Sequence, residues 1–181
     1  RSSSGTETQH IRTFASSPVA APLTGGTITI DGRNGNGSQA DNVTIGGAGS
    51  GIFTQSTGNR PGGDINITTG GSVNLTNGAT ISASSTGVGN AGNIQINAGN
   101  QLAMTNSSVT TEANQSSGGT IKITTNPNGA VQLTDSTISA SVNDGPGGGG
   151  SVNIDPQFVI LQNSQVIAKS VFGPGGNINI T

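Results

Sequence analysis

A short pattern of apolar and polar positions recurs along the chain from Gly25 onward. Two small residues, usually Gly-Gly, precede two β-branched apolar residues that alternate with polar ones. The copies occupy residues 25–30, 62–67, 91–96, 118–123, 149–154 and 175–180. Because alternation with a period of two is typical of a strand with one buried face, each copy predicts a short strand.

Two further short strands are predicted after each copy. The second occupies residues 73–75, 102–104, 131–133 and 159–161, with 43–45 as a displaced first copy. The third occupies residues 81–83, 109–111, 138–140 and 166–168. Between the second and third strands, the matching places hold Asn77, Asn106, Asp135 and Asn163. Asn and Asp tolerate left-handed backbone conformations and bond locally, so these residues predict a tight corner.

Three short strands in each repeat predict a three-sided coil whose turns stack on one another. The repeat is too short and too poor in helix formers for β-α-β units. The predicted fold is therefore all-β, a right-handed parallel β-helix (a three-sided solenoid) of about five to six turns over residues 24–181. Because the repeats differ in length, we expect variable loops mostly at the corner after the third strand, at residues 84–90, 114–117 and 143–148.

A stack of this kind predicts its own core. A single turn cannot bury its isoleucines, whereas successive turns share continuous inward columns. The predicted columns are Ile28/Ile65/Ile94/Ile121/Val152/Ile178, Ile30/Ile67/Ile96/Ile123/Ile154/Ile180 and Ile45/Leu75/Met104/Leu133/Leu161. We expect a charge placed in any of these columns to break the stack, because it would be buried without a partner.

The first 23 residues lack the repeat. We interpret residues 1–23 as a linker, a cap or an edge-pairing strand, and Pro18 and Pro22 disfavour a central strand there. The chain begins at Arg1 and ends within a first strand at Thr181. We expect one of two arrangements: the remainder of a longer chain continues from an open β-helix end, or neighbouring copies join end to end. In the second arrangement, residues 1–23 of one copy would complete the open edge of another.

Composition narrows the range of partners. Charged residues make up 8% of the chain, the net charge is −2, and there is no Trp or Tyr. Without a basic patch or aromatic residues that could stack on bases, nucleic-acid binding is not expected. The apolar runs are too short for a transmembrane segment.

The repeat phrases resemble a known group of proteins. Residues 75–83 (LTNGATISA) and 89–94 (GNAGNI) carry most of the resemblance, which covers about residues 25–181. They resemble the passenger repeats of filamentous-haemagglutinin-like exoproteins of two-partner secretion systems in Gram-negative bacteria. The resemblance implies export through an outer-membrane transporter partner and a long β-helix that is secreted or held at the cell surface. It also implies a role in adhesion, biofilm formation or delivery of a terminal toxin, with this chain as part of the shaft.

Parallel β-helices also include polysaccharide lyases and hydrolases, which need carboxylates or basic residues clustered on one face. The repeat alignment disperses the charges of this chain instead. The aligned positions are Thr27/Asp64/Asn93, Asn106/Asp135/Asn163, Gln95/Lys122/Asn153 and Ser84/Glu112/Ser141/Lys169. We therefore expect no catalytic residues and no enzyme. The alternative is a carbohydrate-binding or carbohydrate-cleaving β-helix, with a groove lined by Asp64, Lys122, Asp135 and Lys169.

No cofactor or metal site is expected. His10 is the only histidine and there is no cysteine, so a zinc site lacks ligands. Residues 31–41 are the best calcium candidate, but Arg33 and Gly35 stand where an EF-hand loop needs oxygen ligands. We interpret this stretch as a corner insertion.

The outward positions are mainly Thr, Asn, Ser and Gln. They give solubility without charge, or they form a weakly charged surface that binds glycans or packs laterally against another shaft. The leading hypothesis is a secreted or cell-surface β-helix shaft of a Gram-negative bacterium, structural or adhesive. We favour a piece of a longer exoprotein, with end-to-end assembly into fibres as the alternative.

Overall fold

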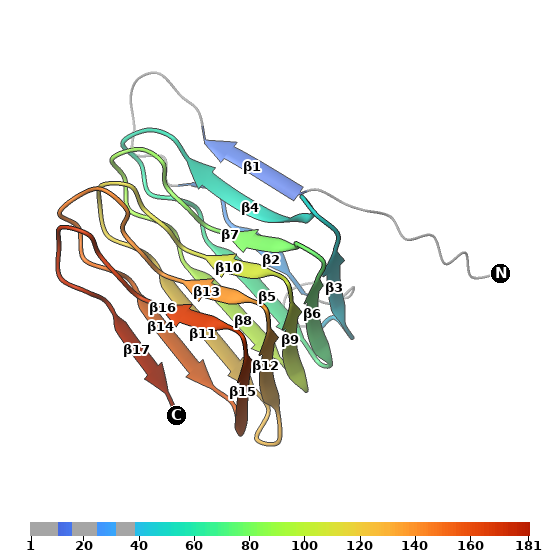
Figure 1. Cartoon of the computed structure of the whole chain (residues 1–181). Coiled ribbons are helices and arrows are strands. Elements are labelled where there is room, and N and C mark those ends of the chain that lie inside the picture. The colour runs from blue at the N-terminus through green and yellow to red at the C-terminus, as the bar shows by residue number, and fades with distance from the viewer. Residues whose placement is uncertain (1–10, 16–24, 32–38) are drawn as a thin grey trace.

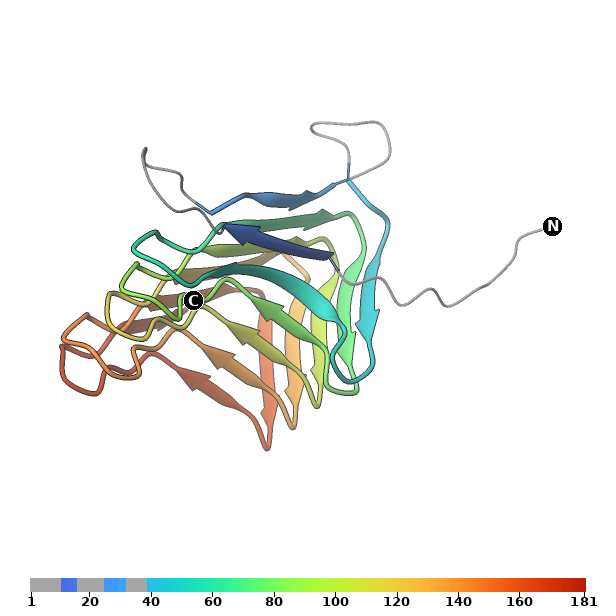
Figure 2. The same cartoon turned by 90° about the horizontal axis from the view of Figure 1, so that it is seen from above.

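The computed structural model describes residues 11–15, 25–31 and 39–181, and within these residues the chain is all-β with no helix. The strands form three parallel sheets, named A, B and C, which make the three walls of a solenoid. Figures 1 and 2 show the turns stacked along one axis, with strands of the same wall side by side. The structure thus confirms the predicted parallel β-helix.

Each turn visits the three sheets in the order B, C, A. Sheet B contains β2 (Ile28–Ile30), β5 (Ile65–Thr69), β8 (Ile94–Ala98), β11 (Thr120–Thr125), β14 (Ser151–Asp155) and β17 (Asn177–Ile180). Sheet C contains β3 (Val43–Gly46), β6 (Ser72–Thr76), β9 (Gln101–Thr105), β12 (Ala130–Thr134) and β15 (Phe158–Gln162). Sheet A contains β1 (Ile11–Ala15), β4 (Gly51–Ser56), β7 (Thr80–Ser82), β10 (Ser108–Thr110), β13 (Thr137–Ser139) and β16 (Gln165–Ile167).

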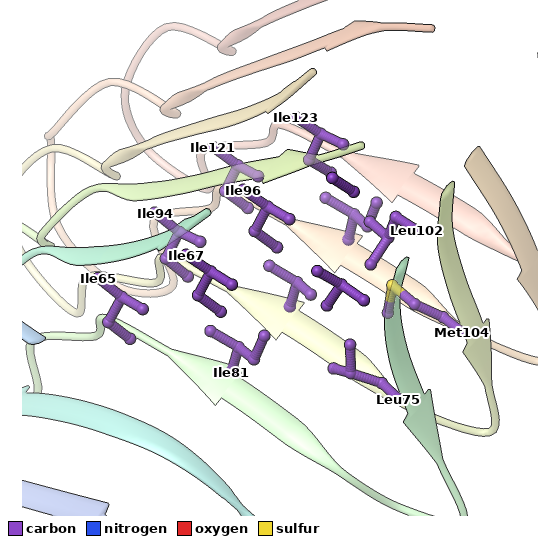
Figure 3. Packing of buried hydrophobic residues seen from close by; sticks show 14 of the residues in the cluster. Ile65, Ile67, Leu75, Ile81, Ile94, Ile96, Leu102, Met104, Ile121 and Ile123 are labelled. Carbon is purple, nitrogen blue, oxygen red and sulfur yellow. The ribbon is translucent and has the colours of Figure 1, made fainter. Parts of the chain in front are cut away.

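The predicted inward columns are in register. Ile65, Ile94 and Ile121 are partners on successive strands of sheet B, and the other two columns pair in the same way. Figure 3 shows these isoleucines in rows inside the solenoid. In the middle turns, the side chains of the inward columns are at most 1% exposed. Each buried side chain of this size contributes on the order of 1.5–3 kcal/mol to stability. Stacking therefore supplies the core that no single turn contains.

Two strands lie outside the predicted three-strand repeats, although an edge-pairing strand was one interpretation of residues 1–23. β4 is the third strand of the first turn, and its Ile52 pairs with Ile81 of β7. β1 lies within residues 1–23 and pairs in parallel with β4, so the solenoid starts one strand before the first Gly-Gly copy. His10, Pro18, Pro22 and residues 32–38 of the calcium candidate lie outside the described residues.

The expected position of the variable loops was only partly right, although the corner insertion expected at residues 31–41 does lie between two strands. The longest insertion separates β2, which ends at Ile30, from β3, which begins at Val43, and a shorter one separates β11 from β12. Both lie between the first and second strands. The segments after the third strands vary less, since Ile94, Ile121 and Val152 follow the paired Ser85, Ala113 and Val142 by nine, eight and ten residues.

Close stacking explains the second glycine of the Gly-Gly motif. A Cβ atom on Gly92 would lie 2.0 Å from the carbonyl oxygen of Gly63 in the preceding turn, and one on Gly119 would lie 1.8 Å from that of Gly92. Real Cβ atoms do not approach backbone this closely. The first position of the motif is less restricted, since it holds Ala91 in the third turn. The motif therefore marks where the backbones of successive turns touch.

The predicted corners between sheets C and A are left-handed. The φ angles of Asn77, Asn106, Asp135 and Asn163 are 56°, 46°, 49° and 49°. Asn and Asp are the non-glycine residues that reach this region at least cost, because their short polar side chains bond locally. Each corner thus reverses the chain in the same way, which keeps the strands of successive turns in register.

Replacing Ile96 by alanine tests the column. Ile96 is fully buried, so Ile96→Ala should lower the free energy of unfolding by about 2–5 kcal/mol. Gln95→Ala, on the exposed face of the same strand, should change it by no more than about 0.5 kcal/mol. Urea unfolding followed by far-UV circular dichroism measures both values, and equal losses would contradict the assigned register.

Replacing Gly92 by alanine tests the backbone contact. The added methyl group must displace backbone of the preceding turn, so Gly92→Ala should cost at least about 2 kcal/mol. Gly58→Ala is the matched control, because a Cβ atom there meets nothing within 4 Å. Thermal unfolding of the two variants should separate them clearly, and a neutral Gly92→Ala would show that the turns are less tightly stacked.

Candidate functional surfaces

The charged residues of the predicted groove lie on different parts of the solenoid. Asp64 precedes β5, and Lys122 lies within β11 on the outward side of sheet B, between Gln95 and Asn153. Asp135 sits at the corner between sheets C and A, and Lys169 follows β16 of sheet A. The fold therefore does not bring these four residues to one groove.

Two of the aspartates form hydrogen bonds between turns. The Oδ1 atom of Asp64 accepts hydrogen bonds from the backbone N–H of Asn93 at 2.8 Å and from its side-chain amide at 3.1 Å. The Oδ1 atom of Asp135 accepts a hydrogen bond from the Nδ2 atom of Asn163. Both carboxylates thus link a turn to the following one.

Other polar side chains do the same at the corners, where the backbone ladder is interrupted. In each case a side-chain oxygen accepts a hydrogen bond from a backbone N–H of an adjacent turn. The pairs are Asn42 with Ser72, Asn90 with Ser117, Asn93 with Thr120, Ser136 with Ser107 and Ser164 with Ser136. The bond to the N–H of Ser107 is buried, where an unpaired N–H group would be costly, and the other four extend the pairing that the strands begin. This explains why Asn and Ser recur at fixed positions.

A serine–glutamate cluster lies on the outward side of sheet A. Ser139 donates a hydrogen bond to the Oε1 atom of Glu112 at 3.1 Å and shares one with Ser141 at 2.9 Å. The backbone N–H of Glu112 donates to the Oγ atom of Ser84 at 3.3 Å. A nucleophilic serine must be reachable by its substrate, but Ser139 and Ser141 are only 3% and 0% exposed. The arrangement fits a link between β10 and β13 better than a catalytic group.

This cluster was only partly foreseen. The repeat alignment correctly placed Glu112 between Ser84 and Ser141, a spacing that the bridges Ser85–Ala113 and Ala113–Val142 confirm. The contact with Ser139 runs diagonally across the sheet, so columns of aligned residues do not reveal it. The repeated Ser-x-Ser at residues 82–84 and 139–141 was the available signal.

Two shallow depressions flank the insertion between β11 and β12. One, of about 560 Å³, is lined by Gly99, Asn100, Asn126, Pro127 and Asn128. The other, of about 380 Å³, is lined by residues of the same insertion together with Asp155, Pro156, Gln157 and Thr181. Their linings offer amide groups and a single carboxylate, and no aromatic ring on which a sugar could stack.

Exposed apolar side chains gather towards the last turn. Leu161, Ile178 and Ile180 belong to the inward columns but are 44–47% exposed, because no turn covers them. Phe158 and Ile160 of β15, and Val171 and Phe172 after β16, are also exposed. The sequence analysis expected the open end at the last turn but did not single out the outward Phe158 and Ile160, although the uninterrupted Phe-Val-Ile-Leu run was visible.

Among the described residues, no group of three or more His, Cys, Asp or Glu side chains could hold a metal ion. Residues 32–38 are not among them, so the calcium candidate at residues 31–41 stays a prediction. Among the same residues, no helix has the length and hydropathy of a membrane span.

Models of known protein families, curated protein sequences and solved structures were compared with this chain, and none of them matches. The family resemblance carried by the repeat phrases therefore stays a prediction. The fold is established by strand pairing and burial, and the function is inferred from the surfaces described above.

Proposed function

We propose that this chain is part of the shaft of a structural or adhesive protein that acts outside the cell or on its surface. The observation that supports this most is the continuity of the inward columns through every turn. The hydrogen bonds between turns add to it, since they engage Asp64, Asp135 and Glu112 in stacking. A solenoid of this kind grows by about 4.8 Å with each added turn, so its natural use is to span distance.

The repeat phrases and the exposed surfaces support three kinds of partner for the shaft: a transporter, surface glycans and a further turn of β-helix. The resemblance to two-partner secretion exoproteins supports export through an outer-membrane transporter partner of a Gram-negative bacterium. The outward Thr, Asn, Ser and Gln side chains supply donors and acceptors for surface glycans without a charge requirement. At the last turn, the half-exposed Leu161, Ile178 and Ile180 would be covered by a further turn, from the remainder of a longer chain or from a neighbouring copy.

A carbohydrate-binding protein is the second candidate, and the depressions beside residues 126–129 favour it. Their amide groups suit sugar hydroxyls. Cleavage has less support than binding, because glycoside hydrolysis ordinarily needs two carboxyl groups and only Asp155 lines either depression.

Incubation with a panel of bacterial and host polysaccharides separates the proposed shaft from a carbohydrate-cleaving enzyme. The shaft proposal expects no release of reducing ends or unsaturated sugars, whether or not the polysaccharide binds. Asp155→Asn should leave any binding unchanged, as should the control Asp144→Asn in the corner after β13. Release of reducing ends that Asp155→Asn abolishes and Asp144→Asn preserves would overturn the proposal in favour of an enzyme.

A further inference from the structure

The outward face of β15 differs from that of every other strand in sheet C. Its outward side chains are Phe158 and Ile160, which are 55% and 50% exposed. Along the register, Phe158 pairs with Ala130, and the same row continues through Gln101 to Ser72. The corresponding row from Ile160 continues through Gln132 and Ala103 to Asn74. Two polar or small positions of the repeat have therefore become large and apolar in this turn.

The direction of these two side chains follows from strand pairing. Val159 and Leu161 pair with Val131 and Leu133, which are fully buried in the solenoid. Alternate residues point to opposite faces of a sheet, so Phe158 and Ile160 point away from the interior. A further turn stacked on β15 would cover Leu161 but would not enclose this outer face.

A strand that is apolar at four successive positions is typical of one covered on both faces. We propose that the outward face of sheet C docks against the same face of a second copy of the chain, with β15 of each copy opposite β3 of the other. The contact is lateral, between the walls of two solenoids, and it rests on the fold rather than on the proposed function.

The absence of charged residues favours sheet C over the other two sheets for this contact. None of its five strands contains an acidic or basic residue. Sheet B presents Lys122 and Asp155, and the outward side of sheet A presents Glu112 beside Ser139. Burying an unpaired charge costs several kcal/mol, so sheet C is the wall that can pack against its own copy without that cost. A partner with a charged face would find no opposite charge on the strands of sheet C with which to form ion pairs.

The sizes of the outward side chains are complementary in one orientation. The two largest outward side chains of sheet C, Phe158 and Ile160, lie on the edge strand β15, whereas the opposite edge strand β3 presents the small residues Thr44 and Gly46. A two-fold axis along the central strand β9 places the bulky edge of each copy against the small edge of the other. Such a pairing is isologous, as expected for contacts between identical chains.

The area of the face determines how strong the contact is. Five strands of about five residues cover roughly 400 Å² at strand spacings near 4.8 Å and rises near 3.3 Å per residue. Stable interfaces bury about 800 Å² on each partner, so two five-turn chains should associate weakly. The buried area grows with every turn, so the same contact becomes stronger in a longer solenoid.

Cysteine cross-linking tests the proposal directly, because the chain contains no cysteine of its own. Ala103→Cys places a single thiol at the centre of the sheet C face, and Gln95→Cys places one on the outward side of sheet B. Under mild oxidation at high protein concentration, Ala103→Cys should give about tenfold more disulfide-linked dimer than Gln95→Cys. Equal yields from the two thiols would overturn the proposal.

A second comparison tests the anchor residues. Phe158→Ser with Ile160→Asn copies the residues found at these positions in β6, so the solenoid should stay folded, as circular dichroism can verify. This change should lower the yield from Ala103→Cys about tenfold, whereas Val171→Ser with Phe172→Ser, on another surface, should not. An unchanged yield in the first variant would contradict the proposal. End-to-end association would give that result, because it does not use the sheet C face.

Discussion

Each turn of this protein lies one strand spacing from the next, and the same repeat position always lies above itself. Inward positions must be apolar in every turn because each side chain packs on its equivalents above and below. The second glycine of the motif cannot carry a Cβ atom, since a carbonyl group of the preceding turn occupies that space. Stacking also explains why charge is scarce. Identical charges in one outward row would lie about 4.8 Å apart, and like charges on adjacent strands destabilise a sheet.

The polar residues satisfy the same constraint in another way. At corners, where strand pairing stops, side chains such as Asn93 and Ser136 accept hydrogen bonds from the adjacent turn and continue the ladder. Glu112 and Asp64 also form hydrogen bonds with residues of the following turn. What remains available for function is the outer surface: three walls with different charge, of which only sheet C has strands without ionisable residues. This arrangement supports the proposal of a protein whose function depends on the length of the solenoid and on contacts made by its outer walls.

The sequence was most informative where stacking forces repetition. The Ile columns and the left-handed corners at Asn77 and its equivalents were predictable, because one physical requirement recurs in every turn. β4 was missed because the corner before it contains Gly47 and Gly49 with positive φ in place of asparagine. The insertion between β11 and β12 was missed because unequal repeat lengths show that extra residues exist but not which corner holds them. The contacts of Glu112 depend on side-chain direction across strands, and no linear pattern records that direction.

Native-state hydrogen exchange measures most directly whether stacking between neighbouring turns holds this molecule together. If each turn is stabilised only by the turns beside it, protection should be greatest in β8 and β9 of the central turn and should decrease step by step towards β3 and β17. The decrease should follow turn number rather than sheet. Protection in β17 as strong as that in β8, or protection that follows one sheet regardless of turn, would contradict this account.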